Sequence, residues 1–600
     1  MKFLFPFIFL ILYVQVSLGQ IRNKYLISFD NAAHHEATVN ITFPNLPGNT
    51  VSLHMSRTSP GRYALHEFSK NIYNLKITNS KGKEVDVVKP NLHQWDIANH
   101  DGTVNVSYTL FANRGDGTYP IIDETHAIIN NPATFMFSSD TEDRPIEITY
   151  QLREDLQWKI ATQMRSAGGT IFLADNLQDF MDSPALLGNF TITQHEVTSG
   201  NEKYNIKFAL QHNGTEEETD AFFDQIKKIV DVQKEVFGGY PSFDQNEYTF
   251  LASFMPQVAR DGMEHRNSTV ITNPKSIADG GMRDNISTFA HEFFHAWNVE
   301  RIRPESLEPF DFSKANVSGE LWFAEGFTSY YTGVTLCRAG IITLDEYISD
   351  ITQTYNKVWT SAGLKNFNVI EMSKKAPFVD AAKTIDPVNK KNTFVSYYSY
   401  GNMLGLALDL SLRNYKDDLN LDDFMKLFWT KYGKTEIPYT LKKIQVTLQE
   451  YAGDSFANDF FENHIYNSQV PDFKKLLSLM GLTLISDRTP YIGAEVEFTK
   501  KGLARISEYT SQGTPAYEAG LEKEDLIISI DNKSFSDIEQ YNEVVKKTIP
   551  GRKVEVKFKR HGVDRSTFVK IDETPFREII RASKESEKAV SKRFKWLGVK

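Results

Sequence analysis

The chain has 600 residues, of which 41% are hydrophobic and 24% are charged, and its net charge is −10. A chain of this length exceeds what a single hydrophobic core can serve, so we expect three or four domains. The composition is that of an ordinary globular protein. The acidic balance argues against a nucleic-acid-binding protein, which usually carries a basic domain.

Residues 1–19 have the pattern of a cleaved signal peptide. Lys2 precedes a run of 12 apolar residues at positions 3–14, and Ser17 and Gly19 supply small residues ahead of the cleavage point. Spanning a bilayer takes about 20 residues, so an uncleaved anchor is the weaker alternative. We therefore expect export, with no stable membrane span once the peptide is removed.

The cysteine and glycosylation patterns bear on the compartment. Cys337 is the only cysteine, so the chain forms no internal disulfide and depends on its cores for stability. Eight Asn-X-Ser/Thr triplets occur. Those at Asn267 and Asn285 lie beside the residues singled out below, where a bulky glycan would be obstructive. These features favour a bacterial periplasmic or secreted protein.

Residues 20–195 alternate apolar and polar positions in short runs such as "ATVNITF" and "GTVNVSYTLF". Turn sequences such as "PNLPGN" and "NSKGKE" separate these runs. This pattern predicts an antiparallel β-sandwich domain. From about residue 216 the periodicity becomes helical, and residues 286–299 and 321–340 are predicted helices. We therefore assign residues 196–482 to a mainly helical domain.

The first of these helices contains "HEFFH". His291 and His295 are one turn apart on one face, so both imidazoles can meet one metal ion. Glu292 is offset by about 100° and is suited to take a proton from water rather than to bind the metal. Two histidines and an adjacent glutamate are typical of a zinc site for peptide hydrolysis. The alternative is a helix with two incidental histidines.

Zinc requires a third protein ligand, and "ELWFAEGFTSYYTG" offers Glu325. This glutamate lies between apolar and small residues, where an unpaired carboxylate would be costly. An acidic side chain near a helix N-terminus, favoured by the helix dipole, is the alternative explanation. Glutamates closer to the histidines lack this apolar setting: Glu300, Glu305, Glu308 and Glu320.

Together, "HEFFHAWNVERIRP", "LWFAEGFTSYY" and "DGMEHRNST" resemble the glycyl aminopeptidase family of gluzincin zinc metallopeptidases. The resemblance extends to "MSRTSPGRYALHEFSKNIYNLK" near the N-terminus. It implies a thermolysin-like catalytic domain with one zinc ion held by His291, His295 and Glu325, and Glu292 as the general base. The fold class is then multidomain α+β.

The resemblance also implies two further site residues. Glu264 matches the glutamate that holds a substrate's α-ammonium group, and an ordinary loop carboxylate is its alternative reading. Tyr398 matches a tyrosine that stabilises the oxyanion. This chain has Tyr400 where the related pattern has lysine, and Tyr397 and Tyr400 remain alternatives for the role.

Residues 485–572 resemble a PDZ domain, with "GTPAYEAGLEKEDLIISIDNKSF" carrying the likeness. PDZ domains bind extended peptides at a sheet edge, and a docking module with a closed groove is the alternative. Residues 573–600 are predicted to form a basic helical tail on the surface. This order predicts that a chain ending near residue 480 keeps its catalytic core.

The sequence thus predicts a zinc aminopeptidase for peptides with a free N-terminus, and the family resemblance adds a preference for glycine or alanine there. Two alternatives stay open at this point. One is a zinc endopeptidase of the same fold, and the other is a catalytically silent peptide-binding protein. The intact set of four metal-site residues argues against the silent protein.

Overall fold

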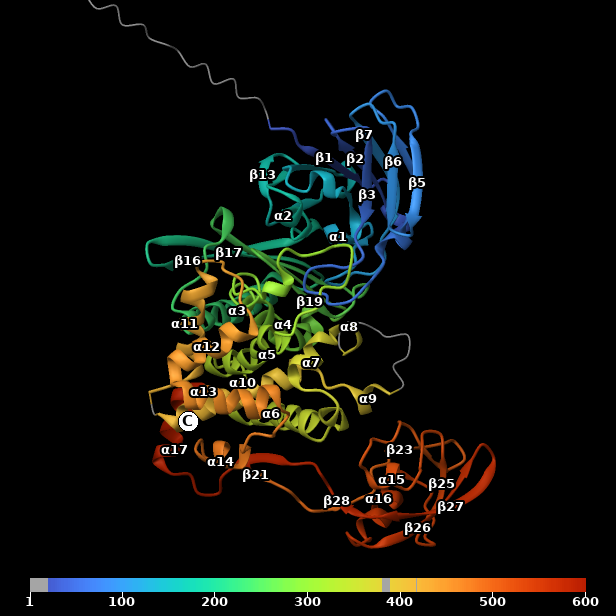
Figure 1. Ribbon diagram of the computed structural model, residues 1–600, viewed down its shortest axis with the longest axis vertical. Coiled ribbons are helices and arrows are strands. Elements are labelled where there is room, and N and C mark those ends of the chain that lie inside the picture. Colours follow the sequence, from blue (N-terminus) through green and yellow to red (C-terminus); the bar gives the residue numbers. More distant parts are fainter. Residues whose placement is uncertain (1–19, 380–388, 417, 600) are drawn as a thin grey trace, which may run out of the picture.

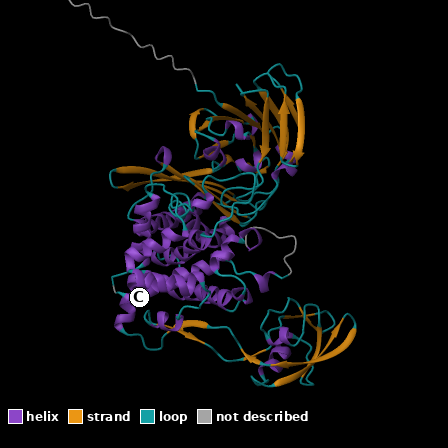
Figure 2. Ribbon diagram, in the orientation of Figure 1, coloured by secondary structure: helices purple, strands orange, loops and turns teal. Residues whose placement is uncertain are grey.

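The computed structural model describes residues 20–379, 389–416 and 418–599, and the predicted signal peptide lies outside them. A β-rich N-terminal part, a mainly helical middle part and a small β-rich part follow one another along the chain (Figures 1 and 2). This confirms the predicted multidomain α+β class. Among the described helices, none combines the length and apolar character needed to cross a bilayer.

Two sheets enclose the N-terminal core, as the alternating pattern predicts. In β2 and β7 every second residue is buried, and these residues face strands of the smaller sheet across one hydrophobic core. One pairing departs from the antiparallel prediction, because β1 and β11 run parallel. The larger sheet contains β1 (Asn23–Ser28), β2 (Glu36–Phe43), β4 (Ile72–Thr78), β7 (Val104–Phe111), β11 (Ile146–Gln151), β13 (Arg165–Gly168) and β14 (Ile171–Ala174). The smaller sheet contains β3 (Thr50–Met55), β5 (Asp86–Asn91), β6 (Gln94–Ala98) and β10 (Met136–Phe137).

A second β-layer connects this domain to the helices. Its first strand begins at Thr191, so it crosses the expected boundary at residue 196. The strand order is β16-β17-β18-β20-β19, and β19 is an edge strand that pairs antiparallel with β20. These strands are β16 (Thr191–Ser199), β17 (Glu202–His212), β18 (Glu247–Phe254), β19 (Asp261–His265) and β20 (Ser268–Asn273). A small third sheet of the N-terminal part contains β8 (Ile121–Ile122), β9 (His126–Ile129), β12 (Lys159–Thr162) and β15 (Ala185–Gly188).

The helical layer packs on one face of the five-stranded sheet formed by β16 to β20 (Figure 2). Helix α3 begins with a capping box at Thr215 and Glu218 and is followed by Gly238 in the left-handed conformation. The main helices of the helical layer are α3 (Glu216–Phe237), α4 (Met282–Phe294), α5 (Leu321–Arg338), α6 (Leu344–Trp359), α7 (Val369–Lys374), α10 (Tyr397–Tyr415), α11 (Leu421–Phe428), α12 (Leu441–Ala452), α13 (Asp454–Phe460) and α14 (Phe473–Ser478).

Helices α5 and α10 cross in direct backbone contact at two glycines. A Cβ at Gly326 would lie 2.7 Å from the carbonyl carbon of Gly401, which is closer than any side chain tolerates. Small residues at a crossing let helix axes approach closely. This crossing fixes α5 and α10 relative to each other near Glu325 and Tyr398.

The C-terminal part forms its own hydrophobic core, with strand order β23-β24-β25-β26-β27. These strands lie within residues 485–572, where the sequence predicts a PDZ domain. Its elements are β23 (Val496–Phe498), β24 (Ala504–Ile506), α15 (Pro515–Glu518), β25 (Leu526–Ile530), α16 (Ile538–Lys546), β26 (Lys553–Arg560) and β27 (Val563–Lys570).

The prediction of a surface tail at residues 573–600 is wrong. After the PDZ domain the chain returns to the helical part, where β29 (Glu578–Arg581) pairs antiparallel with β21 (Leu482–Ile485). Helix α17 (Glu587–Leu597) then buries Trp596 completely, and its Nε1 donates to the Tyr330 hydroxyl at 2.8 Å. The prediction missed this apolar face because the segment is rich in basic residues. One of them, Arg593, is buried and forms an ion pair with Glu585.

Candidate metal centre

Two histidines meet at the C-terminal end of α4. His291 lies in its last turn, and His295 directly follows it in right-handed helical conformation, with the ring centroids 4.8 Å apart. The predicted helix to residue 299 is therefore too long. The Nδ1 of His295 lies 2.6 Å from the carbonyl oxygen of Asn298, and such a bond fixes the ring and leaves Nε2 for another partner.

Glu325 faces both histidines from the first turns of α5. Its Oε2 lies 3.5 Å from His291 Nε2 and 3.3 Å from His295 Nε2. Its Oε1 accepts a hydrogen bond from the Tyr63 hydroxyl at 2.6 Å. Asn298 donates to the carbonyl oxygens of residues 323 and 324, so the turn after α4 is bonded to the start of α5. The long segment between the two helices thus loops out without separating the three side chains.

These three residues fit a zinc ion. Their donor atoms lie within 4.8 Å of one another. Glu325 is 1% exposed, and in the described part of the chain no hydrogen bond reaches its Oε2. Burial raises the pKa of Glu325, but the charge of His295 and the close approach of both imidazoles outweigh it and hold the pKa far below its usual range. Two imidazole nitrogens and one carboxylate oxygen form a common catalytic zinc ligand set.

Two further carboxylates adjoin His295. Glu292 from α4 and Glu264 from β19 are each 6% exposed, and their oxygens lie within 4.8 Å of each other and of a His295 nitrogen. Burial raises the pKa of Glu292 well above its usual value, and the nearby charge of Glu264 raises it further. Burial also raises the pKa of Glu264, although His295 opposes the shift. Such a pair is suited to share protons and to attract a cation.

Of the three candidate tyrosines, Tyr398 lies nearest the histidines. It stands in the first turn of α10 and is half-buried, with its ring centroid 6.0 Å from that of His291. Tyr397 is fully buried and packs against Tyr63, while Tyr400 is fully buried against Trp359. All six residues singled out in the sequence thus meet around one point.

The sequence did not single out Tyr63 or Asn298. Asn298 lies beside the histidine motif, so its nearness to the site could have been inferred. Tyr63 lies in the N-terminal domain within "MSRTSPGRYALHEFSKNIYNLK", where the family resemblance marks the stretch but no residue in it. Its neighbour Arg62 forms an ion pair with Asp261 at the start of β19.

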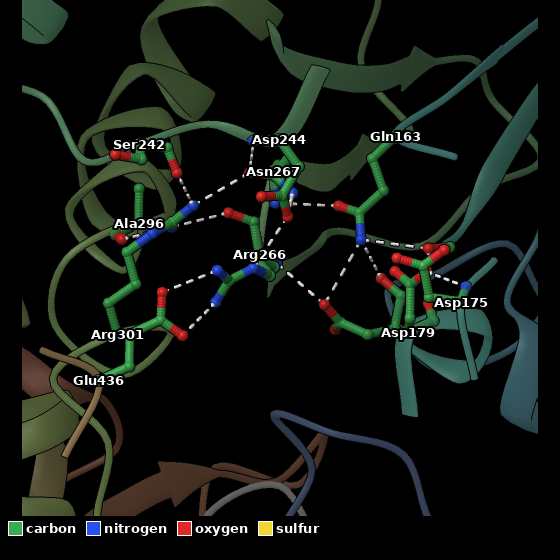
Figure 3. A network of polar contacts seen from close by, with 12 residues as sticks. Gln163, Asp175, Asp179, Ser242, Asp244, Arg266, Asn267, Ala296, Arg301 and Glu436 are labelled. Atoms are coloured by element: carbon green, nitrogen blue, oxygen red, sulfur yellow. Dashed lines mark hydrogen bonds and ion pairs between the residues drawn. The ribbon is translucent and has the colours of Figure 1, made fainter. Parts of the chain in front are cut away.

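The other end of β19 is bonded to the N-terminal domain through a separate polar network. Asp182 accepts from the backbone N–H of Arg266 at 3.0 Å. Gln163 accepts from the backbone N–H of Asn267 at 3.0 Å (Figure 3). Arg266 in turn forms an ion pair with Glu436. A cavity of about 690 Å³ adjoins this network, and none of the six site residues lines it. This network therefore holds β19 in place rather than contributing to the metal centre.

Comparisons with known proteins agree with this arrangement. Residues 24–189 match the Peptidase M61 N-terminal domain, residues 284–404 match M61 glycyl aminopeptidase, and residues 490–571 match a PDZ domain. No curated protein sequence matches the chain.

One solved structure is similar over nearly all of this chain. An aminopeptidase N family protein from Idiomarina loihiensis is 25% identical with a TM-score of 0.81, over 96% of this chain and 100% of that one. An M1 zinc metallopeptidase from Deinococcus radiodurans is 11% identical with a TM-score of 0.44, over 75% of this chain and 95% of that one. With both M61 domains and a PDZ domain in one polypeptide, the chain belongs to the M61 glycyl aminopeptidase family and is a zinc aminopeptidase.

Proposed function

We propose that this enzyme removes small N-terminal residues, glycine or alanine, from peptides with a free α-amino group. The observation that carries the proposal is the meeting of His291, His295 and Glu325 within 4.8 Å, with Glu264 and Glu292 buried beside them. The preference for glycine and alanine rests on the family resemblance.

In this proposal one zinc ion per chain is held by the two histidines and Glu325. When bound, zinc polarises the scissile carbonyl group and lowers the pKa of a water molecule. The hydrogen bond from His295 Nδ1 to Asn298 keeps Nε2 free for this purpose.

The other residues move protons and stabilise charge. Glu292 takes a proton from the attacking water at Oε2, which is buried and has no hydrogen-bond partner among the described residues. It then passes the proton to the leaving amine. The Tyr398 hydroxyl donates a hydrogen bond to the carbonyl oxygen as negative charge develops there.

Glu264 makes the enzyme an exopeptidase. A buried carboxylate opposite the substrate's ammonium group forms a charge-assisted contact that an internal peptide bond cannot supply. Burial of Glu264 against β20 and the loop at residues 56–66 limits the space beyond the ammonium group.

Hydrolysis of free and N-acetylated glycyl and alanyl substrates tests the proposal. We expect rapid cleavage of free substrates, loss of cleavage with a chelator, and little cleavage of acetylated ones. Equal cleavage of both substrate types would support the endopeptidase instead, and no cleavage by zinc-loaded protein would support the silent peptide-binding protein.

Metal analysis tests the ligand set. Purified protein should contain about one zinc per chain, and a His295→Ala variant should lose most of it, because two ligands hold zinc far less tightly than three. Stoichiometric zinc in that variant would exclude the proposed ligands.

Two further proposals concern location and partners. The chain is exported to a bacterial periplasm or secreted, so N-terminal sequencing of the mature protein should begin at Gln20.

The PDZ domain binds an extended peptide along β23, its edge strand beside α16. A titration of the isolated domain with a peptide library would detect such binding, and a closed groove would give none.

A further inference from the structure

A loop of the N-terminal domain reaches the metal centre. Residues 56–66 follow β3, and the ring of Tyr63 packs between Glu325 and Tyr397, with only 2% of the residue exposed. Its hydroxyl donates to Glu325 Oε1 at 2.6 Å, so a residue outside the catalytic domain contacts an expected metal ligand.

Several contacts fix the position of this loop. Within it, the Thr58 hydroxyl donates to the carbonyl oxygen of Ala64 at 2.7 Å. Outside it, the N–H of Arg57 donates to the carbonyl oxygen of Phe312 at 2.9 Å, and Arg62 is paired with Asp261. Phe312 itself lies in the segment between α4 and α5 and packs in the N-terminal core. The loop that carries Tyr63 is therefore held by contacts with both domains.

The bond to Oε1 determines which way the carboxylate faces. The terminal torsion of a glutamate has a broad energy minimum, so a carboxylate without partners rotates readily. In Glu325 the Tyr63 hydroxyl occupies Oε1, while Oε2 faces His291 and His295. Hydrogen-bonding partners of this kind orient metal ligands and strengthen metal binding.

We propose that Tyr63 is a positioning residue of the metal site, whose hydroxyl holds Glu325 with Oε2 turned toward the two histidines. This inference rests on the proposed function, since it assumes that these three residues bind zinc. The N-terminal domain then supplies part of the metal site, and zinc retention depends on how the two domains dock.

The Tyr63→Phe variant tests this role, because it removes the hydroxyl and keeps the ring. We expect zinc affinity to fall by about 10–100-fold and zinc to be released faster to an excess of chelator. Both quantities are measured without substrate, by competition with a chromogenic chelator. A second variant, Asp261→Asn, weakens the anchor of Arg62 and should raise the zinc release rate by a smaller factor.

Tyr108→Phe is the matched control. Tyr108 is 1% exposed in the N-terminal core. Its hydroxyl donates to the carbonyl oxygen of Thr134 at 2.7 Å and accepts from the backbone N–H of Met136 at 3.1 Å, so the variant loses two buried hydrogen bonds away from the site. Its zinc affinity should equal that of the unmutated protein. Unchanged zinc affinity in Tyr63→Phe, or equal losses in both variants, would overturn the role of Tyr63 while leaving the proposed function standing. Absence of zinc from the unmutated protein would overturn the proposed metal site as well.

Discussion

Glu264 and Glu292 are neighbouring buried carboxylates with different connections. Glu292 follows His291 on α4, whereas Glu264 comes from β19, the strand that both domains hold. Two carboxylates this close repel each other unless a proton or a cation lies between them. Replacing each carboxylate by an amide should therefore impair a different function, proton transfer for Glu292 and binding of the substrate's ammonium group for Glu264.

Glu292→Gln keeps the side-chain shape but removes the proton acceptor. We expect kcat to fall by about 10²–10⁴-fold while zinc content stays normal, because the ligands are untouched. Steady-state kinetics with metal analysis measures both. The exposed Glu305 offers a control, since Glu305→Gln should change neither quantity. Near-normal kcat in zinc-loaded Glu292→Gln would remove the general-base assignment.

Glu264→Gln removes the charge that meets the substrate's ammonium group. Loss of such a contact in a dry cleft costs roughly 2–5 kcal/mol. This corresponds to a drop in kcat/KM of about thirtyfold to several-thousandfold on free peptides, with normal zinc content. The measurement compares free and acetylated substrates. If the variant acts on free peptides as well as the unmutated enzyme does, Glu264 is no anchor for the N-terminus.

Sequence reasoning found the residues whose relation is local. The spacing of His291, Glu292 and His295 follows from helix geometry, and Glu325 stood out as a carboxylate among apolar residues. The bond between Tyr63 and Glu325 spans 262 positions in the chain. No periodicity relates two residues that far apart, because the contact depends on how separate domains dock.

At the scale of elements, the active-site groups depend on a few close contacts between helices. The contact of Gly326 with Gly401 joins α5, which carries Glu325, to α10, which carries Tyr398. The hydrophobic periodicity predicted α5 but could not predict which helix crosses it. It also extended α4 too far, because Trp297 and Val299 continue the apolar pattern after the helix has ended. Val299 instead has a φ of 131°, which no helix contains.

Gly401→Ala should separate these two helices. The added Cβ would overlap the backbone of Trp322, so the crossing must open. Overpacking of this kind costs about 1–3 kcal/mol, more than the alanine gains in helix propensity. We expect a lower melting temperature and a lower kcat, measured by thermal unfolding and kinetics. The added Cβ of Gly405→Ala on the same helix would meet only side-chain atoms, those of Tyr330 and Phe327, and should have a smaller effect. Equal stability of Gly401→Ala and the unmutated protein would contradict the close crossing.

At the scale of the whole molecule, the PDZ domain is inserted rather than appended. The chain leaves the helical part at β21 and returns to it after the PDZ domain (Figure 1). There β29 pairs with β21, and Ile485 lies opposite Glu578. The sequence located the PDZ domain correctly because its turns and strands are local. The sequence did not predict the return of the chain, because nothing in either segment alone indicates that β21 pairs with β29.

The insertion reverses the prediction that a chain ending near residue 480 keeps its core. Such a chain lacks β29 and α17, and losing a buried tryptophan alone costs about 3–5 kcal/mol. Replacing residues 486–577 by Asn-Gly should instead close β21 and β29 into a hairpin. We expect this variant to keep kcat/KM on short peptides, and a chain ending at residue 586 to unfold at lower temperature. A well-folded but inactive hairpin variant would mean that the PDZ domain completes the site.

The position of α17 also sets the order in which the enzyme is completed. Trp596 and Leu597 fill the core beside α5, yet they are synthesised long after that helix. Domains fold largely in the order of their synthesis, so the N-terminal sandwich can form early. The peptidase core must wait until α17 has been synthesised. Translation that stops within the PDZ domain, or a cut that removes α17, therefore yields a protein without a complete peptidase core, and activity itself reports that the chain has been made at least as far as α17.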